Sequence, residues 1–576
     1  MHNKIDLTLS PDVLFLNPWR DPGFRLLLEP EYNWRPIKGG HIAGFAASAY
    51  PEINKKIEQF LRRTKKHRTL ATPVEFNSVP VMLEQASFRK SFVLAQDRML
   101  LSGAAATRAL TRYRRDNYTA GIDAELRLTE FFASCREHNK DKDIPVYSGL
   151  LESHIPFAIE CRNTFNYFHF ITESLAQLTV LDGLDFQGDI YFHFPNSEDK
   201  QRPFAKAFAE ALFPEFKERI FFERVPKDYS QVVTAYEVNG GYRMAPFADF
   251  DGLAKHMPDS KVWHDGVVSS QAHEPLAMNV VNTNLISLRA RALRAIDGLD
   301  FGHLPKRFFV GRDTRVSRAR HLEGEDLLFE HLQMFGFEYV VFESLSPLEQ
   351  IALMARAEMM VSYHGAGFTN MLFASPETYV VEIGTLQTAQ IRWGDFWPLA
   401  NASTCKYASF YGDFKSNNPL LEPVFGEDGI VPASLSEQAI GQVMAFIVTV
   451  LGYFPDLKES GILAQLAREV LQSGAAQRAV ALLELHEDLV RENGSLCLIK
   501  ADCHKELGEP KSELVALDLA YKADPARWQT LVRMIWCANH CERPQVVRWA
   551  LSRLKTDFPD RHDAFVSKHS WVRYVA

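Results

Sequence analysis

The sequence predicts an α/β protein with two Rossmann-like lobes and an all-α domain of helical repeats at its C-terminus. Three observations support this fold class. Short apolar strands alternate with helical stretches from about residue 145, the alternation is regular between 305 and 385, and a helical pattern fills the chain beyond about 458. Alternating strands and helices indicate a parallel sheet with helices on its faces. At 576 residues the chain exceeds what one hydrophobic core usually supports, so several domains are expected.

Changes in pattern along the chain place the domain boundaries near residues 140, 304 and 457. We expect an N-terminal extension or part of the first lobe at 1–140, the first lobe at 141–304, the second lobe at 305–457, and helical repeats at 458–576. The apolar helix predicted at 436–454 would cross back from the second lobe to the first.

The second lobe is predicted element by element. Apolar strands are expected at 307–310, 337–342, 359–363 and 379–383, with helices at 323–335 and 346–357 and a further helix after the turn at 364–367. Ser346 as N-cap and Pro347 at the first helical position are typical of a helix start. Four strands with three intervening helices form a doubly wound half-molecule. The first lobe has a similar pattern, with a strand at 190–194 and helices at 174–181 and 203–212.

The C-terminal region contains a regular repeat. Gly474, Gly508 and Glu542 are evenly spaced, and Pro510 and Pro544 are separated by the same interval. A 34-residue period of paired helices, which this interval matches, is typical of tetratricopeptide repeats. Stacked helix pairs form extended concave surfaces, so we expect a protein partner there.

The composition is that of a folded protein and excludes some functional classes. Hydrophobic residues make up 46% of the chain and charged residues 24%. The net charge of -8 argues against a general nucleic-acid-binding protein, which usually carries an excess of basic residues. The seven cysteines have no spacing typical of a zinc site, so we expect reduced thiols in a cytosolic protein.

The apolar runs and the N-terminus bear on location. The N-terminus lacks the regions of a signal peptide. The run 439–454 is too short to span a bilayer comfortably. We therefore expect a cytoplasmic protein, with peripheral contact at the inner face of a membrane left open. The basic stretch 62–68 is either a solvated helix end or a site for anionic lipid or a charged glycan.

The first chemical signal is a turn at the end of a predicted strand. It reads His364-Gly365-Ala366-Gly367-Phe368-Thr369-Asn370. A helix start favours a phosphate, and glycines let the backbone approach a ligand closely. Thr369 and Asn370 could add side-chain hydrogen bonds. The alternative is a tight turn with a packing histidine.

Two further features belong to the same predicted crevice. Arg312, Arg315 and Arg318 follow the strand 307–310, and clustered arginines suit a pyrophosphate. Glu382 lies near the end of the next strand along the chain, where its carboxylate could accept hydrogen bonds from ribose hydroxyls.

A second signal lies in the first lobe. His169 and Glu173 are four residues apart, so on a helix they share one face. Such a pair can act as a general base with an orienting carboxylate. The alternative for this pair is a surface hydrogen bond or a helix cap. An aspartate such as Asp249 is the alternative candidate for the base.

Four blocks together resemble glycosyltransferase family 61, which includes bacterial capsule and lipopolysaccharide enzymes. They are the Asn-Tyr-Phe-His-Phe-Ile-Thr-Glu-Ser-Leu block at 166–175, the arginine-rich segment at 311–320, Leu345 to Gln350, and the turn at 364–370. The resemblance covers roughly residues 150 to 390. It implies a GT-B fold with two lobes facing a cleft, inverting chemistry, and a UDP-type donor held mainly by the second lobe.

The resemblance also implies roles for single residues. The three arginines and the turn would hold the diphosphate, Glu382 would face the ribose, and His169 with Glu173 would lie on the acceptor side of the cleft. Asp249-Phe250-Asp251 has the Asp-x-Asp form of metal-dependent enzymes, but a GT-B site does not require it, so no metal or other cofactor is expected.

We therefore expect transfer of a sugar from a nucleotide-sugar donor to a glycan acceptor during bacterial surface-polysaccharide assembly. Two alternatives remain open at this point. One is a non-catalytic scaffold in which the repeats bind partners. The other is a nucleotide-sugar epimerase.

Overall fold

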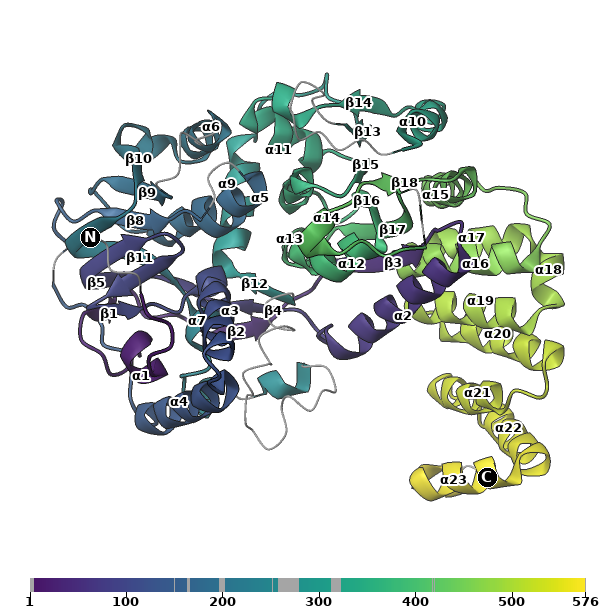
Figure 1. The fold of residues 1–576 in the computed structure, drawn as a ribbon. Helices are drawn as coiled ribbons and strands as arrows, with labels where there is room; N and C mark the ends of the chain where they lie inside the picture. The colour runs from purple at the N-terminus through teal and green to yellow at the C-terminus, as the bar shows by residue number, and fades with distance from the viewer. Residues whose placement is uncertain are drawn as a thin grey trace.

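The computed structural model describes residues 5–149, 151–162, 166–195, 203–250, 252–256, 279–311, 323–416, 418 and 420–574. Within these residues the chain is an α/β protein with mixed sheets, followed by a helical region at the C-terminus (Figure 1). In Figure 1 the first sheet lies on the left, the second in the centre and the C-terminal helices on the right. The predicted α/β class with an all-helical C-terminal region is therefore confirmed.

The first sheet has eight strands in the order β10-β9-β8-β11-β5-β6-β7, with β1 against β5. Its strands are β1 (Phe24–Leu26), β5 (Ser78–Arg89), β6 (Phe92–Ala95), β7 (Arg98–Met99), β8 (Phe157–Glu160), β9 (Ile190–Phe194), β10 (Ile220–Arg224) and β11 (Lys227–Glu237). The strand predicted at 190–194 is confirmed as β9. The sheet combines residues from both sides of the boundary expected near 140.

The prediction of a parallel sheet is correct for only part of the first sheet. Strands β10, β9, β8 and β11 run parallel, whereas β5 runs antiparallel to β11 and to β6. Ser91 (φ 69°) lies in the turn between β5 and β6, and Gln96 and Asp97 (φ 48° and 65°) join β6 to β7. Tight turns with positive φ connect antiparallel neighbours. The N-terminal residues thus add an antiparallel half to the sheet.

The second sheet is parallel along its main path, in the order β14-β13-β15-β16-β17, and β3 pairs with β17. Its strands are β3 (His41–Ala46), β13 (Arg307–Val310), β14 (Glu338–Val340), β15 (Met359–Tyr363), β16 (Tyr379–Thr385), β17 (Lys406–Phe414) and β18 (Ala433–Ser434). The predicted strands at 307–310, 359–363 and 379–383 are confirmed. β3 belongs to the N-terminal part of the chain, which therefore contributes to both sheets.

A small third sheet joins β2 (Trp34–Pro36), β4 (Val74–Phe76) and β12 (Val280–Asn282). The helices before the C-terminal region are α1 (Pro11–Leu14), α2 (Pro51–His67), α3 (Gly103–Thr119), α4 (Ala124–Asn139), α5 (Tyr167–His169), α6 (Pro203–Leu212), α7 (Val238–Gly241), α9 (Thr283–Ala295), α10 (Glu325–Gln333), α11 (Pro347–Ala355), α12 (Leu386–Arg392), α13 (Trp397–Ser403), α14 (Phe425–Asp428) and α15 (Glu437–Val450). The N-terminus of α11 is capped as predicted. The Ser346 hydroxyl accepts a hydrogen bond from the Glu349 N–H, and the Glu349 carboxylate accepts one from the Ser346 N–H.

Two predicted helices are not α-helical. The segment after the turn at 364–367 is a 3-10 helix, Ala366–Phe373. Gly367 in its first turn has a low helix propensity, which favours this short form. In the first lobe a π-helix, Phe170–Ser174, continues directly into a 3-10 helix, Leu175–Leu181.

One hydrophobic cluster joins the first and second sheets. It includes Phe157 and Phe192 from the first sheet, and Phe308 and Met360 from the second. Helix α9 supplies Leu288 to the same cluster and contacts α11 and α13. The contact between the two sheets is therefore a packed core, with the polar site described below at its margin.

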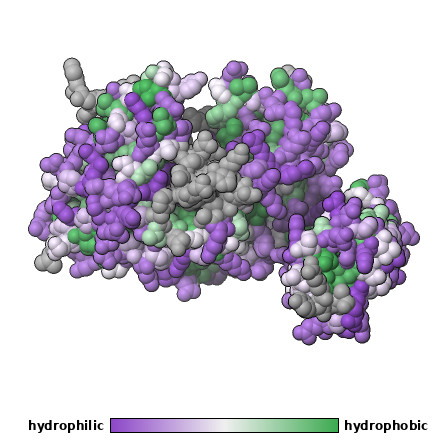
Figure 2. All heavy atoms as spheres, turned by 90° about the horizontal axis from the view of Figure 1, so that it is seen from below, coloured by the Kyte–Doolittle hydropathy of each residue, from purple (hydrophilic) through white to green (hydrophobic). Residues whose placement is uncertain are grey.

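The C-terminal region consists of stacked helices that continue the core of the second sheet. They are α16 (Ser460–Gln472), α17 (Ala476–Leu485), α18 (Glu487–Arg491), α19 (Gly494–Glu506), α20 (Pro510–Ala523), α21 (Trp528–His540), α22 (Pro544–Asp557) and α23 (Pro559–Lys568). Gly474, Gly508 and Glu542 have φ of 84°, 70° and 55° and each separates two helices. Their even spacing in the sequence therefore marks equivalent left-handed turns. Figure 2 shows a hydrophobic patch on these helices amid mostly hydrophilic atoms.

The membrane prediction can be compared with the helix lengths. Among the described residues, no helix is both long enough and apolar enough to cross a bilayer.

Candidate functional site

A cavity of about 340 Å³ lies between the ends of two strands of the first sheet and the segment that links α12 to α13. Two of its walls are formed where β8 and β11 end, at Glu160 and Glu237. Helix α3 and the α5 segment contribute from the first lobe, and the second lobe contributes Arg392 and Asp395. Ligands of open α/β sheets bind at the carboxyl ends of parallel strands, which is where this cavity lies.

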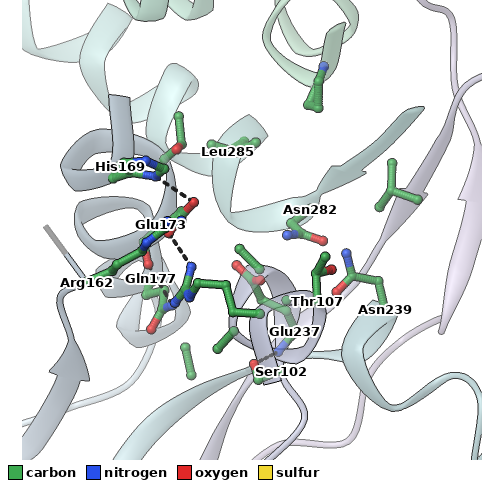
Figure 3. Close-up of a pocket in the computed structure, with 18 of the residues that line it drawn as sticks. Ser102, Thr107, Arg162, His169, Glu173, Gln177, Glu237, Asn239, Asn282 and Leu285 are labelled. Atoms are coloured by element: carbon green, nitrogen blue, oxygen red, sulfur yellow. Dashed lines mark hydrogen bonds and ion pairs between the residues drawn. The ribbon is translucent and has the colours of Figure 1, made fainter. Parts of the chain in front are cut away.

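His169 and Glu173 form one wall of the cavity (Figure 3). His169 ends α5, and Glu173 lies in the π-helix that follows. The Nδ1 atom of His169 is 2.8 Å from Oε1 of Glu173, and the two side chains are 18% and 17% exposed. The expected pairing of these residues is therefore present. π-helical turns are uncommon and often occur at functional sites.

Two residues behind the pair extend it into a buried chain of charges. Arg108 of α3 donates to Oε2 of Glu173 at 2.6 Å and to Oε2 of Glu160 at 3.2 Å. Glu160 also accepts a hydrogen bond from the backbone N–H of Ser91 at 2.8 Å. The carboxylate of Glu173 is thus held between His169 and Arg108, a position that favours its ionised form.

The carboxyl groups of the cavity have opposite pKa shifts. Burial alone would raise the pKa of Glu173, but the hydrogen bond from His169 and the charges of His169 and Arg108 lower it to about 2. Burial raises the pKa of Glu160 to about 7, and Arg108 offsets only part of this effect. Burial likewise raises the pKa of Glu237 to about 7. Near neutral pH, Glu173 is the fixed anion of the cavity, and the other two carboxyls are close to their titration midpoints.

The side chain of Glu237, the last residue of β11, lies against the N-terminus of α3. Its Oε1 accepts a hydrogen bond from Asn284 at 2.7 Å, and its backbone N–H donates to the hydroxyl of Ser102, the N-cap residue of α3. Gly103 has φ 46°, and the Glu237 carboxylate occupies the space that a Cβ at residue 103 would need. A glycine is therefore required where α3 meets this carboxyl group.

The second-lobe wall carries Arg392 and Asp395, which form an ion pair at 3.2 Å. Burial raises the pKa of Asp395, while the charges of Arg392, His364 and His169 oppose that shift. Asp395 therefore lies within electrostatic reach of both histidines. The adjacent Phe396 ring contacts the rings of Phe168 and His364, with centroids 5.7 and 5.5 Å apart. The His169 wall and the His364 turn are thus neighbouring parts of one site.

The His364 turn is supported from below by Glu382. Nδ1 of His364 is hydrogen bonded to Oε1 of Glu382, and the other carboxylate oxygen accepts from the hydroxyls of Tyr407 and Ser409. Glu382 is only 1% exposed. The structure therefore places this carboxylate under the turn, where it orients His364, and not at the surface where a ribose was expected.

The remaining turn residues divide into two groups. Gly365, Ala366 and Gly367 are partly exposed, whereas Thr369 and Asn370 are fully buried. Oδ1 of Asn370 accepts a hydrogen bond from the Tyr167 hydroxyl at 2.6 Å, so it joins the two lobes. The first group presents backbone at the start of a helix, and the second holds the turn in place.

The expected arginine cluster lies outside the described residues, because Arg312, Arg315 and Arg318 all belong to the gap between 311 and 323. The described chain reaches this gap from β13, where Val310 pairs with Ser362 of β15. The carboxyl end of β13 is thus adjacent to the strand that ends at the His364 turn.

Asp249 does not lie in the cavity. It lines a separate small pocket together with Tyr236 and Val238. Along the chain at the end of β11, these two residues alternate with Ala235 and Glu237, which line the cavity. Alternate strand residues point to opposite faces of a sheet. Asp251 is outside the described residues. Among the residues that are described, no group of three or more His, Cys, Asp or Glu side chains could hold a metal ion.

Several residues of the site were not singled out from the sequence: Arg108, Glu160, Glu237, Arg392 and Asp395. A signal was present for two of them. Glu160 and Glu237 each end an apolar strand, the same pattern that drew attention to Glu382. Arg108 lies in an ordinary amphipathic helix and carries no local signal.

A family model matches part of the chain. Residues 167–381 match the family model Glycosyltransferase 61. A search of curated proteins finds no match. The matched segment contains His169, Glu173 and the His364 turn, whereas α3 with Arg108 precedes it. The match supports assignment of this segment to glycosyltransferase family 61, and hence a glycosyltransferase acting on a sugar donor and an acceptor.

Proposed function

We propose that the protein transfers a sugar, with inversion, from a nucleotide-sugar donor to a hydroxyl group of a glycan acceptor, and that His169 is the general base. The observation that supports this most directly is the buried chain His169–Glu173–Arg108 in the wall of the cavity. It lies beside the His364 turn, which has the features of a phosphate site.

The contact with Glu173 supports one arrangement of the protons of His169. Because the pKa of Glu173 is about 2, its carboxylate is ionised at neutral pH and accepts the hydrogen bond from Nδ1. The proton of neutral His169 therefore resides on Nδ1, and Nε2 is the basic nitrogen. In the proposed step the acceptor oxygen forms a bond to the anomeric carbon as its proton passes to Nε2. The bond from that carbon to the phosphate oxygen breaks, and the nucleoside diphosphate leaves.

On the donor side, we propose that the diphosphate binds at the start of the 3-10 helix after His364. The first N–H groups of a helix have no partner within it and favour an anion. Arg312, Arg315 and Arg318 would supply cations from the end of β13. Glu382 would act through His364, because its carboxylate is buried and shared with Tyr407 and Ser409.

The wider setting follows from the resemblance and the sequence. We propose that the two sheets are the centres of the two lobes of a GT-B fold, since strands of the first sheet and the segment after α12, which follows the second sheet's strand β16, both line the cavity. The C-terminal helices would be tetratricopeptide-like repeats that bind a protein partner, supported by the equivalent, evenly spaced turns. A UDP-linked donor, a role in bacterial capsule or lipopolysaccharide assembly and a cytoplasmic location complete the proposal.

The first experiment is a thermal-shift screen against UDP, GDP, CMP and ADP. A ligand that binds only the folded state raises the melting temperature. We expect one nucleotide to raise it, and Arg315→Ala to abolish the shift. Arg294→Ala is the matched control, because Arg294 is an exposed arginine near the C-terminal end of α9 and does not line the cavity. Equal shifts in both variants would contradict the donor site, and the absence of any shift would favour a non-catalytic scaffold.

A second experiment separates transfer from epimerisation. The donor class found in the screen is incubated with the protein, with and without a panel of glycan acceptors. Transfer requires an acceptor and releases the nucleoside diphosphate. An altered nucleotide-sugar formed without any acceptor would identify an epimerase.

A further inference from the structure

Helix α2 carries a concentration of positive charge that the proposed reaction does not use. Residues 51–68 contain seven Lys and Arg residues and two Glu residues, a net charge of +5 in a chain whose total is -8. The C-terminal half of this segment, from 60 to 68, has no acidic residue. Its exposed cations are Arg62, Arg63, Lys65 and Lys66.

These four cations form one face of the helix, opposite the face that packs on the protein. At about 100° per residue they fall within an arc of about 160°. Ile53, Ile57 and Thr64 are buried on the other side, where α2 contacts β3 and α12. The cations therefore project outward from the molecule. The apolar side of α2 is already occupied by the protein core.

The charges of this basic face are not neutralised within the described part of the chain. Lys56, nearer the N-terminus of α2, forms an ion pair with Glu422. Arg62, Arg63, Lys65 and Lys66 have no carboxylate within ion-pair distance among the described residues. Four like charges on one helix face repel one another, so an external anion would stabilise the arrangement.

We propose that the basic face of α2 docks on an anionic lipid surface. Clusters of four or more Lys and Arg residues on an amphipathic helix are typical of such docking, because attraction to acidic headgroups needs no shaped pocket. Since its apolar side is packed on the protein, α2 lies on the headgroups and does not insert. Binding is therefore purely electrostatic and sensitive to salt.

The position of α2 connects this surface with the cavity. α2 packs on α12 (Figure 1). α12 ends at Arg392, which lies in the cavity wall. α2 lies on the lower side of the molecule in Figure 1, the side seen in Figure 2. The cavity wall is thus one helix away from the docking face, which suits an acceptor glycan carried on a lipid. The docking itself does not depend on the proposed reaction.

The test is sedimentation of the full-length protein with vesicles of phosphatidylcholine, with and without phosphatidylglycerol. We expect binding only to the anionic vesicles, weakened as salt rises above about 0.1 M. The test variant is Arg62→Gln/Arg63→Gln/Lys65→Gln/Lys66→Gln. Each cation contributes roughly fivefold to the partition coefficient, so this variant should lose more than tenfold.

The matched control removes the same four charges elsewhere. Arg543→Gln/Arg548→Gln/Lys555→Gln/Lys568→Gln replaces two exposed arginines and two exposed lysines in and beside α22 and α23. It should bind anionic vesicles like the unmodified protein. Both variants should retain the circular dichroism spectrum and melting temperature of that protein.

Three results would overturn the proposal. They are no binding to anionic vesicles at low salt, equal binding by the two variants, and binding to a soluble polyanion such as dextran sulfate without binding to vesicles. The last result would identify a charged glycan as the ligand of this face. None of them bears on the nucleotide screen, so docking and the proposed reaction can fail separately.

Discussion

Arg108 is the residue whose replacement tests the buried charges of the cavity most directly. Its side chain is 13% exposed and it contacts two carboxylates, Glu173 at 2.6 Å and Glu160 at 3.2 Å. Arg108→Gln would remove the cation that contacts both carboxylates directly. Removing one partner of a buried ion pair costs about 3–5 kcal/mol of unfolding free energy. At pH 6, where Glu160 is mostly protonated, we expect a loss of about 3 kcal/mol, arising from Glu173.

The loss of unfolding free energy in Arg108→Gln should increase with pH, because Arg108 also contacts Glu160. Burial raises the pKa of Glu160 from 4.5 to about 7. Between pH 4.5 and pH 7 the native state keeps a proton on Glu160 that the unfolded state has lost, so the free energy of unfolding decreases as the pH rises. This decrease ends above pH 7, where Glu160 is ionised in both states. Without Arg108 the pKa of Glu160 rises further, so the fall continues. Each pH unit above 7 adds about 1.4 kcal/mol, which brings the loss at pH 8 to about 4–5 kcal/mol.

The assay is urea-induced unfolding at pH 6 and pH 8, with Arg112→Gln as the control. Arg112 lies one turn further along α3, with its guanidinium over the ring of Phe92. Burial and the neighbouring arginines lower the pKa of Arg112, so neutralising it removes repulsion. The control should lose less than about 1 kcal/mol at either pH. A loss for Arg108→Gln that is equal at both pH values, or no larger than the control, would refute the reasoning.

Three further predictions concern the base, the second buried carboxyl and the repeats. His169→Ala and Glu173→Gln should each lower the transfer rate by about 10²–10⁴-fold and leave the nucleotide-induced thermal shift unchanged; a lost shift would contradict an acceptor-side role. Burial raises the pKa of Glu237 from 4.5 to about 7, so the free energy of unfolding decreases as the pH rises across this range. In Glu237→Gln this decrease, measured by unfolding at pH 5 and 8, should be smaller by up to about 3 kcal/mol. Glu542→Gly should stabilise the protein and Gly508→Ala should destabilise it, by about 1 kcal/mol each, because both positions have φ near 60°. Effects of the same sign in thermal unfolding would show that the two turns differ.

The second sheet was predictable because its strands are short apolar runs between helix signals. All five residues of Met359–Tyr363 and all seven of Tyr379–Thr385 are buried. Strands covered on both faces have continuous apolar sequences, which separate them from the helices. β3, in contrast, is partly exposed and pairs with β17, which lies in a distant part of the sequence. No local pattern identifies so distant a partner.

The first sheet was predicted only in part for a related reason. The residues before 140 form the antiparallel half, and their turns contain Ser91, Gln96 and Asp97 without the Asn-Gly or Asp-Gly pairs that usually mark such hairpins. The prediction that this region is an extension or part of the first lobe therefore could not anticipate that it supplies strands to both sheets.

The site shows the same limit at the level of single side chains. His169 and Glu173 could be paired from the sequence because a helix brings residues four apart together. Arg108 meets Glu173 only because α3, which follows the antiparallel strands β5 to β7, lies beside the ends of β8 and β11 at Glu160 and Glu237. That placement turns a histidine–carboxylate pair into a buried chain with a fixed anion, since Arg108 helps to keep the pKa of Glu173 low. The base in the proposed reaction thus depends on a helix outside the segment that matches the family model, and residues 103–119 belong to the functional unit as much as the motif itself.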